Sequence, residues 1–340
     1  MTRQLESTML SPVTPPGPRR ALRPKQSVLV LGEALVDRFA EGPVVGGAPF
    51  NVARSLAAFG VATTMLTRIG DNDDDGARVL ASALRFGLDD RAIQRDRHHA
   101  TGAVTVIERD GGHRFQIHAD AAWDHIALDE AQAALRAAAP QLVYFGTLAQ
   151  RSSTSATTLR ALLDATQALR YLDLNLRSGQ DNRTLASESL ARADWVKVND
   201  DELRSLLLWF VPEVDAAAPD DSDAQRRGVR RLMRCFSLSR LIVTRGAQGY
   251  VAYDALGRNI AHGAGQAVPR LVDSVGAGDA FSAAYLALQS AGRPAAASLA
   301  GANRYAAAIC GERGALPDDR EFFSAWRWTL GLTGPVAVIA

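Results

Sequence analysis

The order of the apolar segments constrains the fold of this chain more than any other feature of its sequence. Short apolar runs, beginning with 27–31 and 62–67, alternate with segments of helical periodicity, beginning with 51–60. The pattern predicts further helices at 74–86 and 152–169 and further strands at 142–145, 171–174, 193–198 and 241–244. Strands that are continuously apolar and alternate with helices build a mostly parallel sheet. The sequence therefore predicts an α/β fold with helices on both faces of a mostly parallel central sheet.

Two β-prone runs interrupt this alternation. Residues 101–109 and 113–119 flank Asp110-Gly-Gly112, which is typical of a hairpin turn. A third run at 41–46 would add a strand to this hairpin. We interpret these strands as a small β-sheet lid over the mouth of the main domain, although an ordinary edge hairpin fits the same periodicity.

Composition limits the class of partner. Of the 340 residues 47% are hydrophobic, enough for a sizeable core. The 38 basic and 37 acidic residues nearly cancel, so no long-range field would attract nucleic acid or an anionic membrane. No apolar run approaches the roughly 18 residues that span a bilayer. We therefore expect a small-molecule partner and neither a nucleic acid nor a membrane.

The first 26 residues differ from the rest of the chain. Residues 1–26 are rich in proline and arginine and lack the apolar segment of a secretory signal, which predicts a disordered leader before one folded domain at 27–335. The two cysteines, Cys235 and Cys310, lie far apart and form no CxxC pair. We interpret both as buried thiols in a reducing cytoplasm, and the protein as cytoplasmic.

The sharpest local signal is Asp273-Ser-Val-Gly-Ala-Gly-Asp279, which precedes a helical run at 280–288. Glycines 276 and 278 allow the backbone to approach a ligand closely, and the first amides of a helix carry the positive end of its dipole. The segment therefore predicts an anion-binding site beside Asp279. For an isolated motif of this kind, a first-turn acid that only stabilises its helix would be the simpler interpretation.

Two motifs together resemble the ribokinase, or PfkB-type, family of carbohydrate kinases. The family's C-terminal signature reads D-T-x-G-A-G-D before a helix, and here Ser274 replaces the threonine and retains the hydroxyl. The N-terminal signature, a Gly-Gly pair followed by an asparagine at a helix start, is present as Gly46-Gly-Ala-Pro-Phe-Asn51. The resemblance spans about residues 27–330. It implies a three-layer ribokinase-like fold with a lid.

The resemblance implies an ATP-dependent sugar kinase in which Asp279 is the catalytic base. The amides of Gly276, Ala277 and Gly278 would stabilise the moving phosphoryl group, assisted by Arg177 of the segment Asp173-Leu-Asn-Leu-Arg177. The residues implied on the sugar side are Asp37, Gly46, Gly47, Asn51 and Arg177. Alone, Asp37 would be an ordinary turn residue and Arg177 a surface residue.

The residues that the resemblance implies on the nucleotide side are Lys197, Asn199, Thr244, Gly246, Gly249, Gly278 and Asn303. Glu202 would hold hydrated Mg²⁺ through water, and it also forms a capping-box pattern with Asn199. Asp273 would lie near a monovalent cation, typically K⁺. The chain has no Walker A sequence and no G-x-G-x-x-G after its first strand, which argues against P-loop and dinucleotide binding.

Two further patterns resemble metal sites only in part. Asp71-Asn-Asp-Asp-Asp-Gly76 matches the first half of an EF-hand loop, but its twelfth position is Ser82, where calcium needs a glutamate. We predict that this segment is a turn before a helix. His98 and His99 have no partner at ligand spacing in the sequence, so we expect exposed polar residues.

The motifs leave the substrate open. Their form is closest to fructokinases, so fructose ranks first and 2-keto-3-deoxygluconate or ribose next, while nucleoside kinases share the fold. A phosphosugar would need basic residues at the mouth, for which Arg38 and Arg114 are candidates. A non-catalytic sugar or nucleotide sensor of the same fold is the alternative from another class. The resemblance also allows a homodimer formed through the lid.

Overall fold

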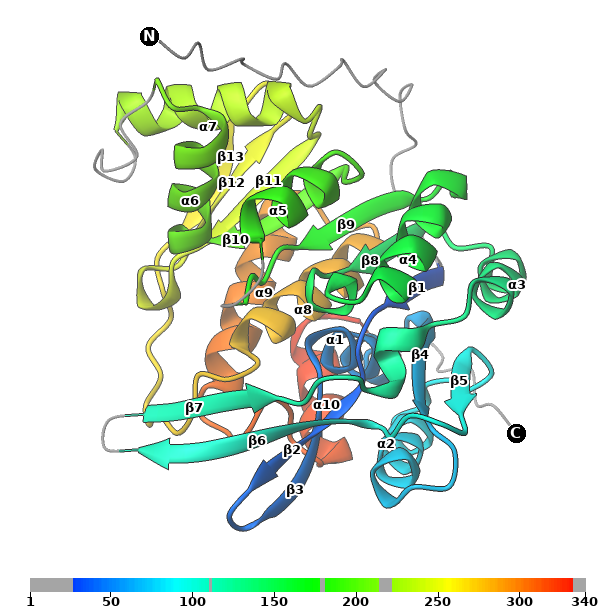
Figure 1. Cartoon of the computed structure of the whole chain (residues 1–340). Coiled ribbons are helices and arrows are strands. Elements are labelled where there is room, and N and C mark those ends of the chain that lie inside the picture. Colours follow the sequence, from blue (N-terminus) through cyan, green and yellow to red (C-terminus); the bar gives the residue numbers. More distant parts are fainter. Residues whose placement is uncertain (1–26, 110–111, 178–180, 214–221, 333–340) are drawn as a thin grey trace, which may run out of the picture.

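A nine-stranded sheet lies at the centre of the molecule (Figure 1). The computed structural model describes residues 27–109, 112–177, 181–213 and 222–332, so the predicted leader lies outside the described residues. In spatial order the strands are β13 (Asn259–Gly263), β12 (Tyr250–Asp254), β11 (Arg240–Thr244), β10 (Trp195–Asn199), β9 (Leu169–Asp173), β8 (Leu142–Phe145), β1 (Ser27–Leu31), β4 (Ala62–Gly70) and β5 (Ile93–Asp96). In this spatial order, all neighbours from β11 across to β5 pair in parallel, and β12 and β13 add an antiparallel edge. The predicted mostly parallel sheet is thus confirmed.

The two faces of the sheet contact different sets of helices. Along β1, Val28 and Val30 join one core cluster and Leu29 and Leu31 the other, because successive side chains of a strand point to opposite faces. The first cluster contains residues of α1 (Ala48–Ala58), α2 (Asp74–Arg85), α8 (Ala277–Ser290), α9 (Ala295–Ile309) and α10 (Arg320–Thr329). The second contains residues of α3 (Leu128–Ala138), α4 (Ser153–Ala165), α5 (Asn182–Leu190), α6 (Asp200–Phe210) and α7 (Asp223–Cys235). The predicted three-layer fold is therefore confirmed.

A second, small sheet projects from the edge of this three-layer body (Figure 1). Its order is β3 (Gly42–Gly46), β2 (Leu35–Phe39), β6 (Gly102–Arg109) and β7 (Gly112–Ile117). The three runs predicted as lid strands correspond to β3, β6 and β7. Strand β2 was not predicted, because the segment that ends at Asp37 was interpreted as a loop. It is a strand because it pairs with β3 on one side and with β6 on the other, contacts that its own periodicity does not reveal.

Some local expectations were wrong. The helix predicted at 152–169 ends at Ala165, because Thr166 adopts an extended conformation and β9 begins at Leu169. Neither cysteine is buried as predicted: Cys235, at the end of α7, is exposed, and Cys310, after α9, is partly exposed. No helix in the described part of the chain is long and apolar enough to cross a membrane.

The acidic segment that resembles half an EF-hand is a helix cap. Both carboxylate oxygens of Asp73 accept hydrogen bonds, Oδ1 from the amide of Gly76 and the hydroxyl of Thr101, and Oδ2 from the Thr101 amide at 2.7 Å. Asp73 therefore caps α2 and at the same time fixes the residue before β6. The prediction of a turn before a helix is confirmed.

We predict that Asp73→Ala lowers the free energy of unfolding by about 1–3 kcal/mol, because three donors lose their acceptor. Urea denaturation followed by circular dichroism measures this loss. The control is Asp75→Ala, which removes ion pairs with the half-exposed Arg38 and Arg78 and is expected to cost less than about 1 kcal/mol. Calcium is expected to leave the wild-type midpoint unchanged; stabilisation by calcium that Asp73→Ala abolishes would show a metal loop instead.

Candidate active site

A cavity of about 1650 Å³ lies between the carboxyl ends of the central strands and the small sheet. Residues after β1, β9 and β11 and the end of β10 contribute to its wall, as do the starts of α1 and α8. Open α/β sheets bind ligands at this end of their strands, where the connections to the next helices diverge. The sequence motifs that start α1 and α8 therefore meet at one site.

The start of α8 is held in place by two glycines. Gly276 caps the helix with φ of 78°, and a Cβ there would lie 2.5 Å from the backbone of Ala315. A Cβ at Gly278 would lie 2.8 Å from Nζ of Lys197. Only glycine fits both the positive φ and the close approach at position 276. The motif therefore needs a glycine there for steric reasons.

Asp279 lies in the first turn of α8 and is only 8% exposed. Its Oδ2 accepts a hydrogen bond from Nδ2 of Asn51 on α1 at 2.9 Å, which joins the two sequence motifs. Burial raises the pKa of Asp279 to about 6, although the Asn51 hydrogen bond opposes the shift. The negative charge of Asp173 raises the pKa further, and the positive charge of Lys197 lowers it.

Two more carboxyl groups line the same cavity. Burial raises the pKa of Asp37, on β2, to about 6, and that of Glu33, just after β1, to about 7. In both cases Arg177 lowers and Asp279 raises the pKa. Oε2 of Glu33 and Oδ1 of Asn51 are buried and have no hydrogen-bond partner among the described residues. These two atoms can accept hydrogen bonds from a ligand.

Sequence reasoning missed Glu33. The only signal was an acid placed directly after Gly32 at the end of a buried strand, a position that parallel sheets often use for ligand contacts. Without the fold, that acid cannot be told from a turn residue. Its burial and its position in the cavity wall make it a functional candidate.

Lys197 and Asp173 form a buried ion pair at the base of the cavity. Nζ of Lys197 lies 3.0 and 3.1 Å from the two carboxylate oxygens of Asp173, and Oγ of Ser282 donates to Oδ2 of the same group at 2.8 Å. Burial lowers the pKa of Lys197, but the charges of Asp173, Glu202 and Asp279 and the hydrogen bond to Asp173 together outweigh this effect, and the net pKa is raised. The ammonium group is thus held charged beside Gly278 and Asp279.

Asn199 and Glu202 form the predicted capping box at the start of α6. Oδ1 of Asn199 accepts from the amide of Glu202, and Oε2 of Glu202 accepts from the amide of Asn199, both at 2.8 Å. Oε1 of Glu202 accepts from the amide of Leu176, also at 2.8 Å. Asn199 lines the cavity, but Glu202 does not.

The structure gathers most of the residues predicted from the sequence, but not all. The predicted residues that line the cavity are Asp37, Gly47, Asn51, Arg177, Lys197, Asn199, Thr244, Gly246, Gly276, Gly278 and Asp279. Those that lie outside its lining are Gly46, Glu202, Gly249, Asp273, Ala277 and Asn303. Arg38 also lies outside, where it pairs with Asp75, and the side chain of Arg114 lies outside the described residues.

The residues outside the lining support the wall. Gly249 has φ of 93°, and a Cβ there would lie 1.9 Å from the carbonyl oxygen of Gly263. Nδ2 of Asn303 donates to the carbonyl of Ala264 at 2.8 Å, and Oδ1 of Asp273 accepts from the amide of Val275 at 2.9 Å. At Gly46, a Cβ would lie 2.5 Å from the carboxylate of Asp37.

Comparison with known proteins assigns the chain to a family. A family model described as pfkB family carbohydrate kinase matches residues 33–320. The fructokinase of Escherichia coli is 30% identical over 282 residues, which cover 76% of this chain and 83% of that protein. The chain therefore belongs to the pfkB family of carbohydrate kinases.

Solved structures share the fold. The fructokinase of Xylella fastidiosa with bound ATP superposes with a TM-score of 0.75 at 22% identity, covering 90% of this chain and 98% of that one. A double mutant of the fructokinase of Vibrio cholerae O395, bound to fructose, ADP and potassium ion, gives a TM-score of 0.72 at 20% identity, covering 90% and 99%.

We predict that Glu33→Gln stabilises the ligand-free protein at pH 8. The raised pKa means that the folded state favours the protonated acid, so this contribution to stability is complete below about pH 4.5 and is lost as pH rises through about 7. A shift of this size corresponds to on the order of 3 kcal/mol. The gain from Glu33→Gln should therefore be largest at pH 8 and only about a quarter as large at pH 5.

Urea unfolding at the two pH values measures this difference. The control is Glu188→Gln on the cavity rim, whose carboxylate is 40% exposed and pairs with Arg160. It is expected to change stability by less than about 1 kcal/mol at either pH. A loss of stability on Glu33→Gln at pH 8 would contradict the buried, uncompensated carboxylate.

Proposed function

We propose that this chain is an ATP-dependent, fructokinase-like sugar kinase that transfers the γ-phosphoryl group of ATP to a sugar hydroxyl, with Asp279 as the base. The observation that carries the proposal is the buried hydrogen bond between Asn51 and Asp279 at the start of α8. It places a carboxylate with a pKa of about 6 beside the first amides of a helix. The carboxylate of Asp279 can accept a proton, and the first amides of α8 can bind an anion.

The reaction needs alignment, a base and charge neutralisation more than it needs covalent chemistry. Asp279 takes the proton of the attacking hydroxyl, and a pKa near 6 keeps it mostly ionised at neutral pH while it remains a useful base. The backbone from Gly276 to Gly278 and the side chain of Arg177 stabilise the charge on the transferring phosphoryl group. Lys197 acts from behind this backbone, where its charge favours the ionised form of Asp279.

The sugar side follows from unpaired acceptors. Glu33, Asp37 and Asn51 line one wall of the cavity, and both Glu33 and Asn51 carry a buried oxygen without a partner among the described residues. A polyhydroxy ligand donates the hydrogen bonds that these oxygens lack, and leaving them unmade is costly. Fructose is our first candidate, and 2-keto-3-deoxygluconate, ribose and nucleosides are the further ones.

The nucleotide side is proposed at Lys197, Asn199, Thr244 and Gly246, which line the cavity, with Gly249 and Asn303 as supports of its wall. Magnesium would accompany ATP and neutralise phosphate charge. Glu202 lies outside the cavity lining and both of its oxygens already accept backbone amides, so it could contact Mg²⁺ only through bound water. Asp273 lies next to the cavity residue Ser274 and fits a nearby K⁺.

Three further proposals concern the whole molecule. The small sheet acts as a lid that excludes water from the cavity during transfer. Its outer strands offer a surface for a homodimer. The protein works in the cytoplasm, where ATP and free sugars are available.

We predict that Asp279→Asn lowers kcat by at least ~10²-fold with little change in the affinity for ATP or sugar, because the variant keeps the shape of the site and loses the base. A coupled assay of ADP release measures the rate, and calorimetry measures binding. The matched control is Asp129→Asn, an exposed first-turn acid of α3. Near-normal turnover would disprove the role of Asp279, and sugar binding without turnover in the wild type would indicate a sensor.

We predict that Asp37→Asn raises the KM for the sugar by ~10-fold or more and changes the KM for ATP much less, because a hydrogen bond to a charged group contributes about 1.5–3 kcal/mol. The assay first ranks fructose, ribose, 2-keto-3-deoxygluconate and a nucleoside with the wild type, and then tests the variant with the preferred substrate. Equal rises in both KM values would place Asp37 outside the sugar site.

A further inference from the structure

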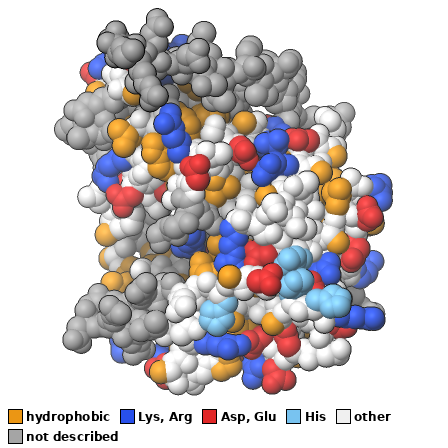
Figure 2. Space-filling model, viewed as in Figure 1, with side chains coloured by type: hydrophobic (Ala, Val, Ile, Leu, Met, Phe, Trp, Pro, Cys, Tyr) orange, Lys and Arg blue, Asp and Glu red, His pale blue; other side chains and the backbone are white. Residues whose placement is uncertain are grey.

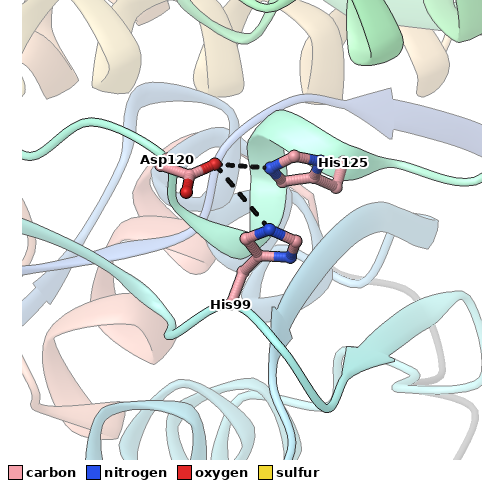
Figure 3. Close-up of side chains that lie close together, drawn as sticks. All are labelled: His99, Asp120 and His125. Carbon is pink, nitrogen blue, oxygen red and sulfur yellow. Dashed lines mark hydrogen bonds and ion pairs between the residues drawn. The ribbon is translucent and has the colours of Figure 1, made fainter.

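Three side chains with metal-ligating atoms converge beside the small sheet, outside the residues proposed for catalysis. They are His99, in the loop before β6, Asp120, shortly after β7, and His125, at the end of η1 (Ala122–His125) (Figure 3). Oδ1 of Asp120 lies 2.8 Å from Nε2 of His125 and 3.8 Å from Nε2 of His99. One ligand atom from each residue lies within 4.8 Å of the other two. Sequence spacing offered no partner for His99, but the fold supplies two.

The ring of His99 is oriented by a buried carboxylate. Nδ1 of His99 lies 3.1 Å from Oδ2 of Asp96, which is 2% exposed. Oδ1 of Asp96 also accepts hydrogen bonds from the amides of His98 and His99, and Oδ2 accepts one from Nε of Arg68 at 2.7 Å. These contacts hold Asp96 in place, so Nδ1 of His99 is occupied by a carboxylate and Nε2 is the ring nitrogen that remains for another ligand.

The other ring nitrogen of His99 faces Asp120. Nε2 of His99 and Oδ1 of Asp120 are 3.8 Å apart, which is longer than a hydrogen bond. A metal ion between them would contact both atoms. A histidine that donates one ring N–H to a carboxylate and turns its other nitrogen to a metal is the usual arrangement of histidine ligands.

We propose that His99, Asp120 and His125 bind one divalent transition-metal ion of the zinc class through two imidazole nitrogens and one carboxylate oxygen. Imidazole ligands favour such ions, whereas Mg²⁺ prefers oxygen ligands and water. The site is therefore separate from the magnesium expected with ATP, and the proposal does not depend on the proposed function. Water completes the coordination, as in other zinc sites with three protein ligands.

The site needs a small rearrangement to hold the ion. Zinc bonds of about 2.0–2.2 Å place ligand atoms roughly 3–3.5 Å apart, so His99 and Asp120 must approach by a few tenths of an ångström. The two imidazole rings are stacked at 3.7 Å and must splay apart. The side chains of His99, His125 and Asp120 are 27%, 30% and 73% exposed, which leaves them room to move. Figure 2 shows histidine side chains adjoining acidic ones at the surface of this part of the molecule.

The bound ion would connect the small sheet to the main body. His99 precedes β6, and Asp120 follows β7, so two chain crossings at the base of the small sheet would share one ion with η1. Asp120 and His125 also contribute to the cavity wall. Metal binding would therefore restrain the base of the small sheet without occupying the residues proposed for catalysis.

The test is a titration of metal-stripped protein with ZnCl₂ and, separately, CoCl₂, without nucleotide because ATP chelates both ions. Calorimetry should show one equivalent bound in the low micromolar range or tighter, and cobalt should give visible absorption typical of nitrogen and oxygen ligands. His99→Ala and His125→Ala should each weaken binding at least ~10-fold. The control, His98→Ala, removes the exposed neighbouring histidine and should leave binding unchanged.

Hydrogen–deuterium exchange of the wild type gives an independent result that does not require the variants to fold. Zinc should slow exchange in segments 97–103 and 118–126. No saturable binding of either ion, or binding that both histidine substitutions leave unchanged, would overturn the proposal. Protection confined to other segments would overturn it as well.

Discussion

The hydrogen bond from Asn51 to Asp279 is the contact on which the rest of the site depends. It joins the starts of α1 and α8, which pack against each other on the same face of the central sheet. Because Gly276 has a positive φ and no space for a side chain, only glycine fits at the start of α8. A carboxylate whose position is fixed by both its backbone and its partner is preorganised, and preorganisation reduces the reorganisation that a reaction requires.

The cavity concentrates charge around this contact. Glu33, Asp37 and Asp279 are acids whose pKa values burial raises to about 7, 6 and 6, and Arg177 lowers the pKa of each. The ammonium group of Lys197 is hydrogen-bonded to Asp173, so its positive charge offsets the negative charge of these acids without a direct contact to them. Such a cluster destabilises the folded protein at neutral pH, and it persists because packing elsewhere, above all in the two core clusters, outweighs it. A ligand that donates hydroxyl groups relieves part of this cost.

The sequence was sufficient wherever the cause of structure is local. Gly276, Gly278 and Asp279 are predictable because the positive φ and the helix start are visible in one short segment, although the atoms closest to the two glycines, in Ala315 and Lys197, come from elsewhere in the chain. Strand β2 is not predictable in this way, because its hydrogen bonds come from β3 and β6. Glu33 was missed for a related reason: its burial depends on the elements around the cavity, and the sequence shows only an acid after a glycine. The cluster around His99 depends on a loop and a turn that meet only in the folded chain.

The path of the chain links the small sheet to Asp279. Strand β3 ends at Gly46, and α1, which holds Asn51, begins two residues later at Ala48. The residue between them, Gly47, has φ of 102°, and a Cβ there would lie 2.7 Å from the carbonyl oxygen of Glu33. The segment that follows β1 and the segment that leads into α1 are therefore in direct contact. If the small sheet closes over the cavity, as proposed, its movement is expected to act on Glu33 and Asn51 together and so to couple ligand enclosure to the alignment of the carboxylate at Asp279.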